Sequence, residues 1–387
     1  MTAAFSASRR GHVSGFHVMR VMELAGRRRA AGQPVFDLSV GQPGAGAPAS
    51  VRAAARTAIE RERLGYTGAL GLPALRVAVA GHHRRSYGVD VDPASVVITT
   101  GSSGAFLLAF LAAFDQGDTV AVARPGYPAY RNMVQALGAR VLDIPTGPGG
   151  ALTVEQLDSI EGWPSGVVLA SPSNPSGSMA SAGQLAEIVA WCDERGIRLI
   201  SDEIYHGITY ACAAQSAWRA EGSAVVINSF SKYFCMTGWR LGWLLAPPEL
   251  LDPIERLAGN FALCPPTLSQ HAALGAFEAY NELDANVARY ALNREFLLRR
   301  LPELGIDRIA PADGAFYVYA DISRWTDDSL SWCARLLDET GVAFAPGIDF
   351  DQVDGGKFVR MCFAGDGAVI ERAVEVMGDW LGRQPLW

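Results

Sequence analysis

The chain has 387 residues, a net charge of −7 and a hydrophobic fraction of 49%, and this length predicts two domains with a ligand held between them. The negative charge and the lack of a long basic run argue against nucleic acid or an acidic membrane as a partner, and no run approaches the roughly 18 apolar residues of a membrane span. The six cysteines form no C-x-x-C pair and 1–32 contains no apolar core of the signal-peptide type, so we expect reduced thiols, no metal site and a cytoplasmic protein.

Residues 1–45 are too short to fold alone, and we expect an N-terminal arm that packs on the smaller domain. From about residue 95 to 246, short β-branched runs alternate with helical patterns. The predicted strands are 95–100, 119–124, 140–144, 166–170, 197–201, 224–228 and 241–246, with helices such as 104–114 and 182–195 between them. Such a pattern predicts an α/β/α sandwich with a mostly parallel sheet, over residues 46–275, whose closely spaced last pair of strands can be antiparallel.

The pattern changes beyond about residue 265. A long helical region is predicted over 268–301, before Pro302. Short strands at 315–320, 342–345 and 358–363 follow, and a helix over 367–381 closes the chain. These elements predict a smaller α+β domain, over residues 276–387.

Lysine is almost absent from this sequence. Only Lys232 and Lys357 stand among the 33 basic residues. Lys357 lies in a turn-like polar stretch and is expected to be exposed. Lys232 lies among apolar and hydroxyl residues, where a buried amine costs free energy unless it is paired or used. Because a guanidinium stays protonated and is a poor nucleophile, a retained lysine is the first candidate for carbonyl chemistry.

Polar and aromatic side chains follow five of the predicted strands. In open α/β sheets, ligands bind outside the carboxyl ends of the strands. The segments at those ends are 101–104, which opens a helix, and 125–127, 171–175, 202–205 and 229–232. Together they bring a helix N-terminus, an aromatic ring, an amide, a carboxylate with a phenol, and the rare lysine to one edge. These are the groups that a phosphorylated aromatic aldehyde requires.

Several of these segments resemble motifs of the class I and II aminotransferases, which depend on pyridoxal 5′-phosphate (PLP) and have fold type I. Ser229-Phe230-Ser231-Lys232, followed by 236–242, resembles the family's PLP-attachment motif. Segments 66–67, 71–76, 171–177, 202–205 and 358–360 resemble its other motifs, in its order. The resemblance covers about residues 14–380. Cys235 departs from the family, which usually has another small residue there.

The resemblance implies a role for the residues around the cofactor ring. Lys232 would form the Schiff base (internal aldimine) with PLP and then act as the general base at the substrate Cα. Asp202 would pair with the pyridine nitrogen and keep the ring an electron sink. Asn174 and Tyr205 would hydrogen-bond the phenolic oxygen, and Tyr127 would stack on the ring.

The phosphate of the cofactor needs anion-binding groups. The helix that opens at Ser102 and Ser103 presents backbone N–H groups that suit an anion. Ser229 and Ser231 would add hydroxyls, and Arg240 a charge-assisted contact. The family resemblance alone adds Tyr66, which would reach the phosphate of the neighbouring subunit. That contribution of Tyr66 implies a homodimer with shared active sites.

The substrate would be held by Arg360, whose planar fork suits the α-carboxylate, together with Asn174 and the backbone of Gly41. Phe16 and His17 lie where the family often lines the pocket for the substrate side chain. No second arginine stands out for a distal carboxylate, which favours neutral or aromatic amino acids. Of the other histidines, His82 and His83 are expected on a solvated helix face, and His206 either tunes the site or packs in the core.

These residues together predict an aminotransferase that moves an amino group between an amino acid and a 2-oxo acid in a ping-pong cycle. A C–S or β-lyase, a decarboxylase or a cyclase on the same scaffold stays open, because a fold does not determine its reaction. A nicotinamide dehydrogenase is disfavoured, since 41–46 lacks the G-x-G-x-x-G spacing. A non-catalytic regulator is disfavoured because the N-terminal arm leaves no room for a DNA-binding module.

Overall fold

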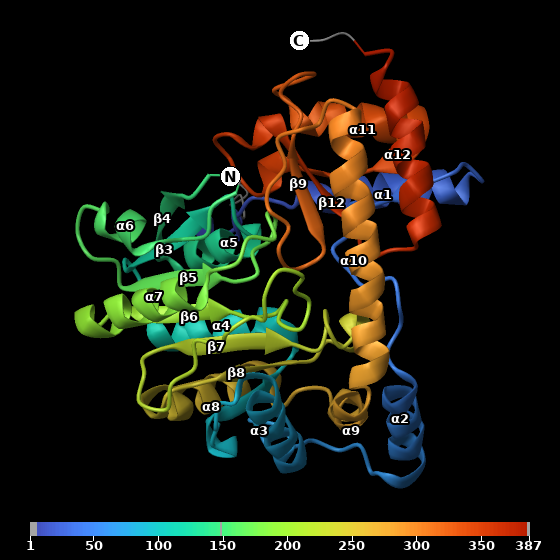
Figure 1. The fold of residues 1–387 in the computed structure, drawn as a ribbon. Coiled ribbons are helices and arrows are strands. Elements are labelled where there is room, and N and C mark those ends of the chain that lie inside the picture. Colours follow the sequence, from blue (N-terminus) through green and yellow to red (C-terminus); the bar gives the residue numbers. More distant parts are fainter. Residues whose placement is uncertain (1–5, 148, 385–387) are drawn as a thin grey trace, which may run out of the picture.

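The computed structural model describes residues 6–147 and 149–384, and a seven-stranded sheet forms the centre of its larger part (Figure 1). The strands run in the order β2-β8-β7-β6-β5-β3-β4. Only β8 is antiparallel to its neighbours, so the mostly parallel sheet and the antiparallel last pair are confirmed. The strand bounds are β2 (Val96–Thr99), β3 (Thr119–Arg124), β4 (Arg140–Pro145), β5 (Gly166–Ala170), β6 (Arg198–Asp202), β7 (Val225–Ser229) and β8 (Gly242–Leu245).

Helices cover both faces of this sheet because successive strand residues point into different cores. Val97 packs into the core beneath Phe106 of α4, whereas Val96 and Ile98 pack into the core beneath Leu75 of α3. This alternation is the two-residue period of a strand that is buried on both sides. One face is covered by α4 (Gly101–Ala113), α5 (Pro128–Leu137) and α8 (Pro248–Ala262), and the other by α3 (Pro73–Tyr87), α6 (Val154–Asp158) and α7 (Ala182–Arg195). The predicted α/β/α sandwich is confirmed.

A smaller sheet-and-helix layer stands above one end of the large sheet (Figure 1). Its three-stranded antiparallel sheet has the order β11-β12-β9. The predicted single strand 342–345 is two strands, β10 and β11, which pair with different partners. The elements are α10 (Tyr280–Glu303), β9 (Tyr317–Asp321), α11 (Ser329–Thr340), β10 (Val342–Ala343), β11 (Ala345–Pro346), β12 (Phe358–Cys362) and α12 (Gly367–Leu381).

The predicted helical region over 268–301 is present but is interrupted. The structure has α9 (Thr267–Leu274), a 3-10 turn over Gly275–Glu278, and then α10. At the interruption the chain passes close to α2 (Ala49–Arg61), where a Cβ on Gly275 would lie 2.7 Å from the carbonyl oxygen of Ser50. This close approach between segments far apart in sequence leaves no trace in the helical periodicity of either one.

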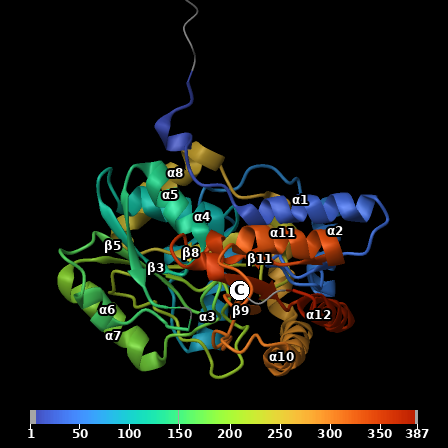
Figure 2. The ribbon, with the colours of Figure 1, turned by 90° about the horizontal axis from the view of Figure 1, so that it is seen from above.

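The N-terminal segment packs on the small layer. Val21 and Ala25 of α1 (His17–Ala30) share a core with Leu337 and Ala343, and Figure 2 shows α1 alongside α11. A short strand, β1 (Phe36–Asp37), pairs with β10. The domain boundaries at 45/46 and 275/276 stay predictions, and no helix within 6–147 or 149–384 combines the length and the apolarity needed to cross a membrane.

The prediction of a solvated face at His82 and His83 is wrong. Their exposed fractions are 7% and 0%. His82 lies stacked on Tyr280, and His83 accepts a hydrogen bond from the Trp243 indole at 3.2 Å. Burial lowers the pKa of His82 to about 4 and holds the pKa of His83 well below its usual range. Both rings are therefore neutral packing groups between α3 and the sheet.

Candidate active site

One cavity of about 270 Å³ lies where the carboxyl ends of β5, β6 and β7 face the small layer. All but two of the residues predicted to act in catalysis or to bind the cofactor or the substrate carboxylate line it. These residues are Gly41, Ser102, Ser103, Tyr127, Asn174, Asp202, Tyr205, Ser231, Lys232, Arg240 and Arg360. The two exceptions are Ser229 and Tyr66. The structure therefore assembles most of the predicted set at the predicted edge of the sheet.

Lys232 follows β7 and points across the cavity to the N-terminal segment. Its amine donates a hydrogen bond of 2.6 Å to the carbonyl oxygen of Gly41. Burial lowers the pKa of Lys232 to about 8, so far more of the amine is neutral and nucleophilic near neutral pH than in an exposed lysine. Only glycine fits at position 41, because a Cβ there would lie 2.1 Å from the hydroxyl of Tyr317.

Asp202 ends β6 and is 3% exposed. Its carboxylate accepts a hydrogen bond from the hydroxyl of Tyr130 and another, of 3.0 Å, from the backbone N–H of Ile204. Burial raises the pKa of Asp202 to about 6, while both hydrogen bonds oppose the rise. Sequence reasoning missed Tyr130. Tyr130 lies three residues after Tyr127, at the start of a helix, and residues with this spacing lie on the same side of a helix. That spacing is the sequence signal that could have identified Tyr130.

Tyr205 meets a second residue that sequence reasoning missed. Its hydroxyl lies 2.7 Å from the hydroxyl of Tyr317 on β9. Burial raises the pKa of Tyr205 well above its usual range, so this phenol stays protonated and able to donate a hydrogen bond. No local motif marks Tyr317, because only the pairing of the two domains brings it to the cavity.

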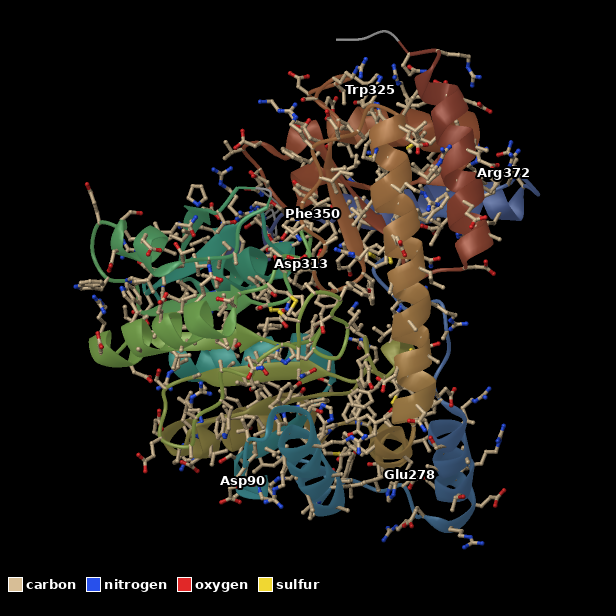
Figure 3. All side chains as sticks on the ribbon, viewed as in Figure 1. Asp90, Glu278, Asp313, Trp325, Phe350 and Arg372 are labelled. Atoms are coloured by element: carbon tan, nitrogen blue, oxygen red, sulfur yellow. The ribbon has the colours of Figure 1, made fainter. Side chains whose placement is uncertain are left out.

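Arg360 lies buried on β12 with one N–H group unpaired. Its two Nη atoms donate to Asn174 Oδ1 at 2.9 Å and to the carbonyl oxygen of Ser39 at 2.7 Å, and its Nε has no hydrogen-bond partner among the described residues. The guanidinium lies 4.3 Å from the ring centre of Tyr317 and 4.7 Å from that of Phe350. Phe350 is labelled in Figure 3, in the small layer near the large domain. No carboxylate neutralises this cation within salt-bridge distance among the described residues, so its charge is available to an anionic ligand.

A second set of cavity residues, at the start of α4, is suited to an anion and forms the anion end of the cavity. Ser102 and Ser103 lie in the first turn of α4, whose N–H groups have no partners within the helix. Arg240 lies over this turn so closely that a Cβ on Gly101 would be 2.8 Å from its Nη2. Ser231 also lines the cavity.

Ser229 and Tyr66 lie outside the cavity in this chain. The hydroxyl of Ser229 accepts a 3.0 Å hydrogen bond from the backbone N–H of Ser231 and donates one of 3.4 Å to the carbonyl of Leu241. It therefore supports the turn that carries Lys232. Tyr66 has an exposed fraction of 85%.

The start of α1 forms an apolar wall on the cavity, made of Phe16, Val18, Met19 and Met22. Phe16 stacks on Tyr127 with ring centres 6.1 Å apart. His17 does not line the cavity. His206 does not either, since it is bound to Tyr87 and to the carbonyl of Ser171, both at 3.0 Å, in a buried network.

These groups fit a phosphorylated pyridine aldehyde. The anion end suits a phosphate, the buried amine suits an aldehyde, and Asp202 offers an acidic partner to a ring nitrogen. The unpaired Nε of Arg360 is left for a second, carboxylate-bearing ligand. Fold and site together define a PLP-dependent enzyme of fold type I.

Comparisons with known proteins give the family. A family model described as aminotransferase class I and II matches residues 33–377. The valine–pyruvate aminotransferase of Mycobacterium tuberculosis is 54% identical over 97% of this chain and 98% of its own. The crystal structure of an aminotransferase from the same organism has a TM-score of 0.96 at 53% identity, covering 98% of this chain and 100% of the other. Aspartate aminotransferase of Thermus thermophilus with maleate has a TM-score of 0.91 at 30% identity, covering 97% and 100%.

The chain belongs to the class I and II aminotransferases. It is a PLP-dependent enzyme that transfers an amino group between an amino acid and a 2-oxo acid. The predicted family, fold, cofactor and reaction type are confirmed.

Proposed function

We propose that this aminotransferase takes a branched aliphatic amino acid of the valine type as donor and a short 2-oxo acid such as pyruvate as acceptor. The observation that carries the proposal is the apolar wall of Phe16, Val18, Met19 and Met22 on the cavity. An apolar wall favours an aliphatic side chain and disfavours a second carboxylate, which would be buried without a partner. The valine–pyruvate aminotransferase of M. tuberculosis, 54% identical, supports the same substrate pair.

Each site residue has a proposed task. PLP, when bound, supplies an electron sink for the bond that breaks at the substrate Cα. Lys232 would hold the aldehyde of PLP and, when its amine is free, would take the proton from the substrate Cα as general base. Asp202 keeps the pyridine nitrogen protonated, and Tyr205 and Asn174 hydrogen-bond the phenolic oxygen.

The remaining predicted residues bind the two anions and one ring face. Tyr127 stacks on the cofactor ring. Arg360 binds the substrate α-carboxylate through its unpaired Nε, next to Gly41. The phosphate is held by Ser102, Ser103, Ser231 and Arg240, with Ser229 as an indirect support.

We also propose a homodimer in the cytoplasm, in which Tyr66 reaches the phosphate of the neighbouring subunit. Support comes from its exposed fraction of 85% in the single chain, and from the groove that Tyr66 lines together with Cys264, which follows the exposed Leu263 (55%) in the sequence. Large apolar side chains exposed together are typical of a protein interface. Sedimentation of the purified protein tests the dimer, and Tyr66→Phe in a dimeric enzyme should weaken cofactor binding.

Stopped-flow half-reactions test the proposed substrate. Valine, alanine, phenylalanine and aspartate are each mixed with the holoenzyme while absorbance reports conversion of the cofactor from its aldehyde to its amine form. We expect the highest kcat/KM for valine and a value for aspartate lower by about a hundredfold or more, because a buried unpaired carboxylate costs several kcal/mol. An aspartate value equal to that for valine contradicts the proposal.

A further inference from the structure

The start of α1, which carries the apolar wall, has no cap of its own. Phe16 occupies the N-cap position of α1 and supplies no side-chain hydrogen bond. A helix begins with N–H groups that have no partner inside the helix, and they need an acceptor from elsewhere. Here that acceptor comes from the other end of the chain.

Asp349 supplies both bonds. Its Oδ1 accepts a hydrogen bond from the backbone N–H of His17, and its Oδ2 accepts one from that of Val18, each at 2.8 Å. These pairs are separated by 332 and 331 residues in the sequence. The carboxylate is 6% exposed, and a bidentate, buried, charged acceptor at a helix N-terminus gives strong hydrogen bonds.

The position of Asp349 ties this cap to the substrate arginine. Asp349 ends the 3-10 turn Gly347–Asp349, which follows β11 directly, and Ala345 of β11 pairs with Arg360 of β12. The next residue, Phe350, lies against the Arg360 guanidinium and accepts a 3.0 Å hydrogen bond from the N–H of Gly126 in the large domain. The wall and the proposed carboxylate-binding group are thus held by one short segment.

We propose that Asp349 is a positioning residue for substrate selection: it caps α1 from the small domain and so holds Phe16, Val18, Met19 and Met22 at a fixed distance from Arg360. An amino acid bound through its α-carboxylate then meets a wall whose depth admits a branched aliphatic side chain. This inference rests on the proposed substrate class for its kinetic part only. Its structural part, the cap, is independent of the substrate.

The capping part is tested by hydrogen exchange with mass spectrometry on the holoenzyme. Asp349→Asn keeps the shape of the side chain but loses one of the two acceptor oxygens, and Asp349→Ala loses both. If one of the two variants does not fold, the other still tests the cap. Amide exchange within residues 16–22 should become faster by about twofold to thirtyfold, the range expected for loss of a helix cap. Asp366→Ala is the matched control, because Asp366 caps α12 through a 2.9 Å bond to the N–H of Ala368, away from the cavity. Its exchange should change in α12 alone.

The selectivity part is tested by the ratio of kcat/KM for valine to that for alanine. Both substrates carry the same α-carboxylate, so an effect of Asp349 on Arg360 changes both values and cancels in the ratio. A displaced wall lowers only the valine value, and the ratio should fall severalfold in both Asp349 variants and stay unchanged in Asp366→Ala. Unchanged exchange in 16–22, or faster exchange with an unchanged ratio, overturns the proposal. If the wild-type enzyme does not use valine, the proposed substrate is wrong, and the exchange experiment alone still decides the cap.

Discussion

Replacing Tyr130 by phenylalanine isolates the hydrogen bond that the Tyr130 hydroxyl donates to the Asp202 carboxylate. The aromatic packing of position 130 survives, since Phe106 and Tyr127 contact the ring at centroid distances of 5.1 and 5.4 Å. The carboxylate retains the backbone N–H of Ile204 at 3.0 Å. The change is thus confined to one donor on one buried acid.

The lost bond should raise the pKa of Asp202. A hydrogen bond to a charged group contributes about 1.5–3 kcal/mol, which corresponds to a rise of about 1 to 2 pH units. The pKa of Asp202 in the wild-type protein is already about 6, because burial disfavours the charged form. In the variant the carboxyl of the apoenzyme should therefore be partly protonated at neutral pH, where the wild-type group is mostly ionised.

Cofactor affinity makes this shift measurable. Binding requires ionised Asp202 opposite the protonated pyridine nitrogen. Above about pH 8 the carboxyl is ionised in both apoenzymes, so the two affinities should be similar. Below about pH 6 it is protonated in both, and the variant should bind PLP about tenfold to a hundredfold more weakly, because its carboxylate is harder to ionise. The assay is an absorbance titration of each apoenzyme from pH 5 to 9, and the contribution of Lys232 cancels in the ratio.

The result that refutes this reasoning is an affinity ratio that does not vary with pH. Tyr319→Phe is the matched control. Tyr319 is 1% exposed and its hydroxyl has no hydrogen-bond partner among the described residues, so removing that hydroxyl should leave the affinity unchanged at every pH.

Three further predictions concern Lys232, Arg360 and Gly41. The rate at which apoenzyme captures PLP should rise about tenfold per pH unit up to about pH 8 and then level off, as the Lys232 amine becomes neutral; stopped-flow absorbance checks this, and a rise that continues to pH 10 contradicts it. Arg360→Lys should raise KM about tenfold or more for valine and alanine alike, with the cofactor spectrum unchanged, because a lysine cannot reproduce the planar fork. Steady-state kinetics measure this, and an unchanged KM would rule out that Arg360 binds the substrate carboxylate. Gly41→Ala should lower the free energy of unfolding by about 1–3 kcal/mol in thermal or denaturant melts, since its Cβ would lie 2.1 Å from the Tyr317 hydroxyl; Tyr317→Phe should restore part of the loss, and no restoration would point to another cause.

The sequence was sufficient for the residues at the ends of strands. Asn174, Asp202 and Lys232 follow strands of a parallel sheet, whose carboxyl ends lie together at one edge, so their meeting follows from topology alone. The scarcity of lysine then singled out Lys232 without any structural information.

The missed residues share a different origin. Tyr130, Tyr317 and Asp349 act through contacts that span 72, 112 and 332 residues of sequence. Each is a common residue type in an ordinary helix, strand or turn, and only tertiary packing gives it a partner. The wrong prediction for His82 has the same cause. A helix that is covered on two sides has a weak amphipathic pattern, so its histidines were assigned to a solvent-exposed polar face.

The hydrogen-bond acceptors of Lys232 and Arg360 explain how one cavity can hold both side chains in their working states. Lys232 and Arg360 each donate to a backbone carbonyl in the same short segment, that of Gly41 at 2.6 Å and that of Ser39 at 2.7 Å. A carboxylate in either place would hold Lys232 protonated and would neutralise Arg360. A carbonyl satisfies the N–H groups without adding charge, so the amine keeps a pKa of about 8 and the guanidinium keeps its charge for a substrate carboxylate. Neutral backbone acceptors from the N-terminal segment therefore allow a nucleophile and an anion-binding group to share one buried site.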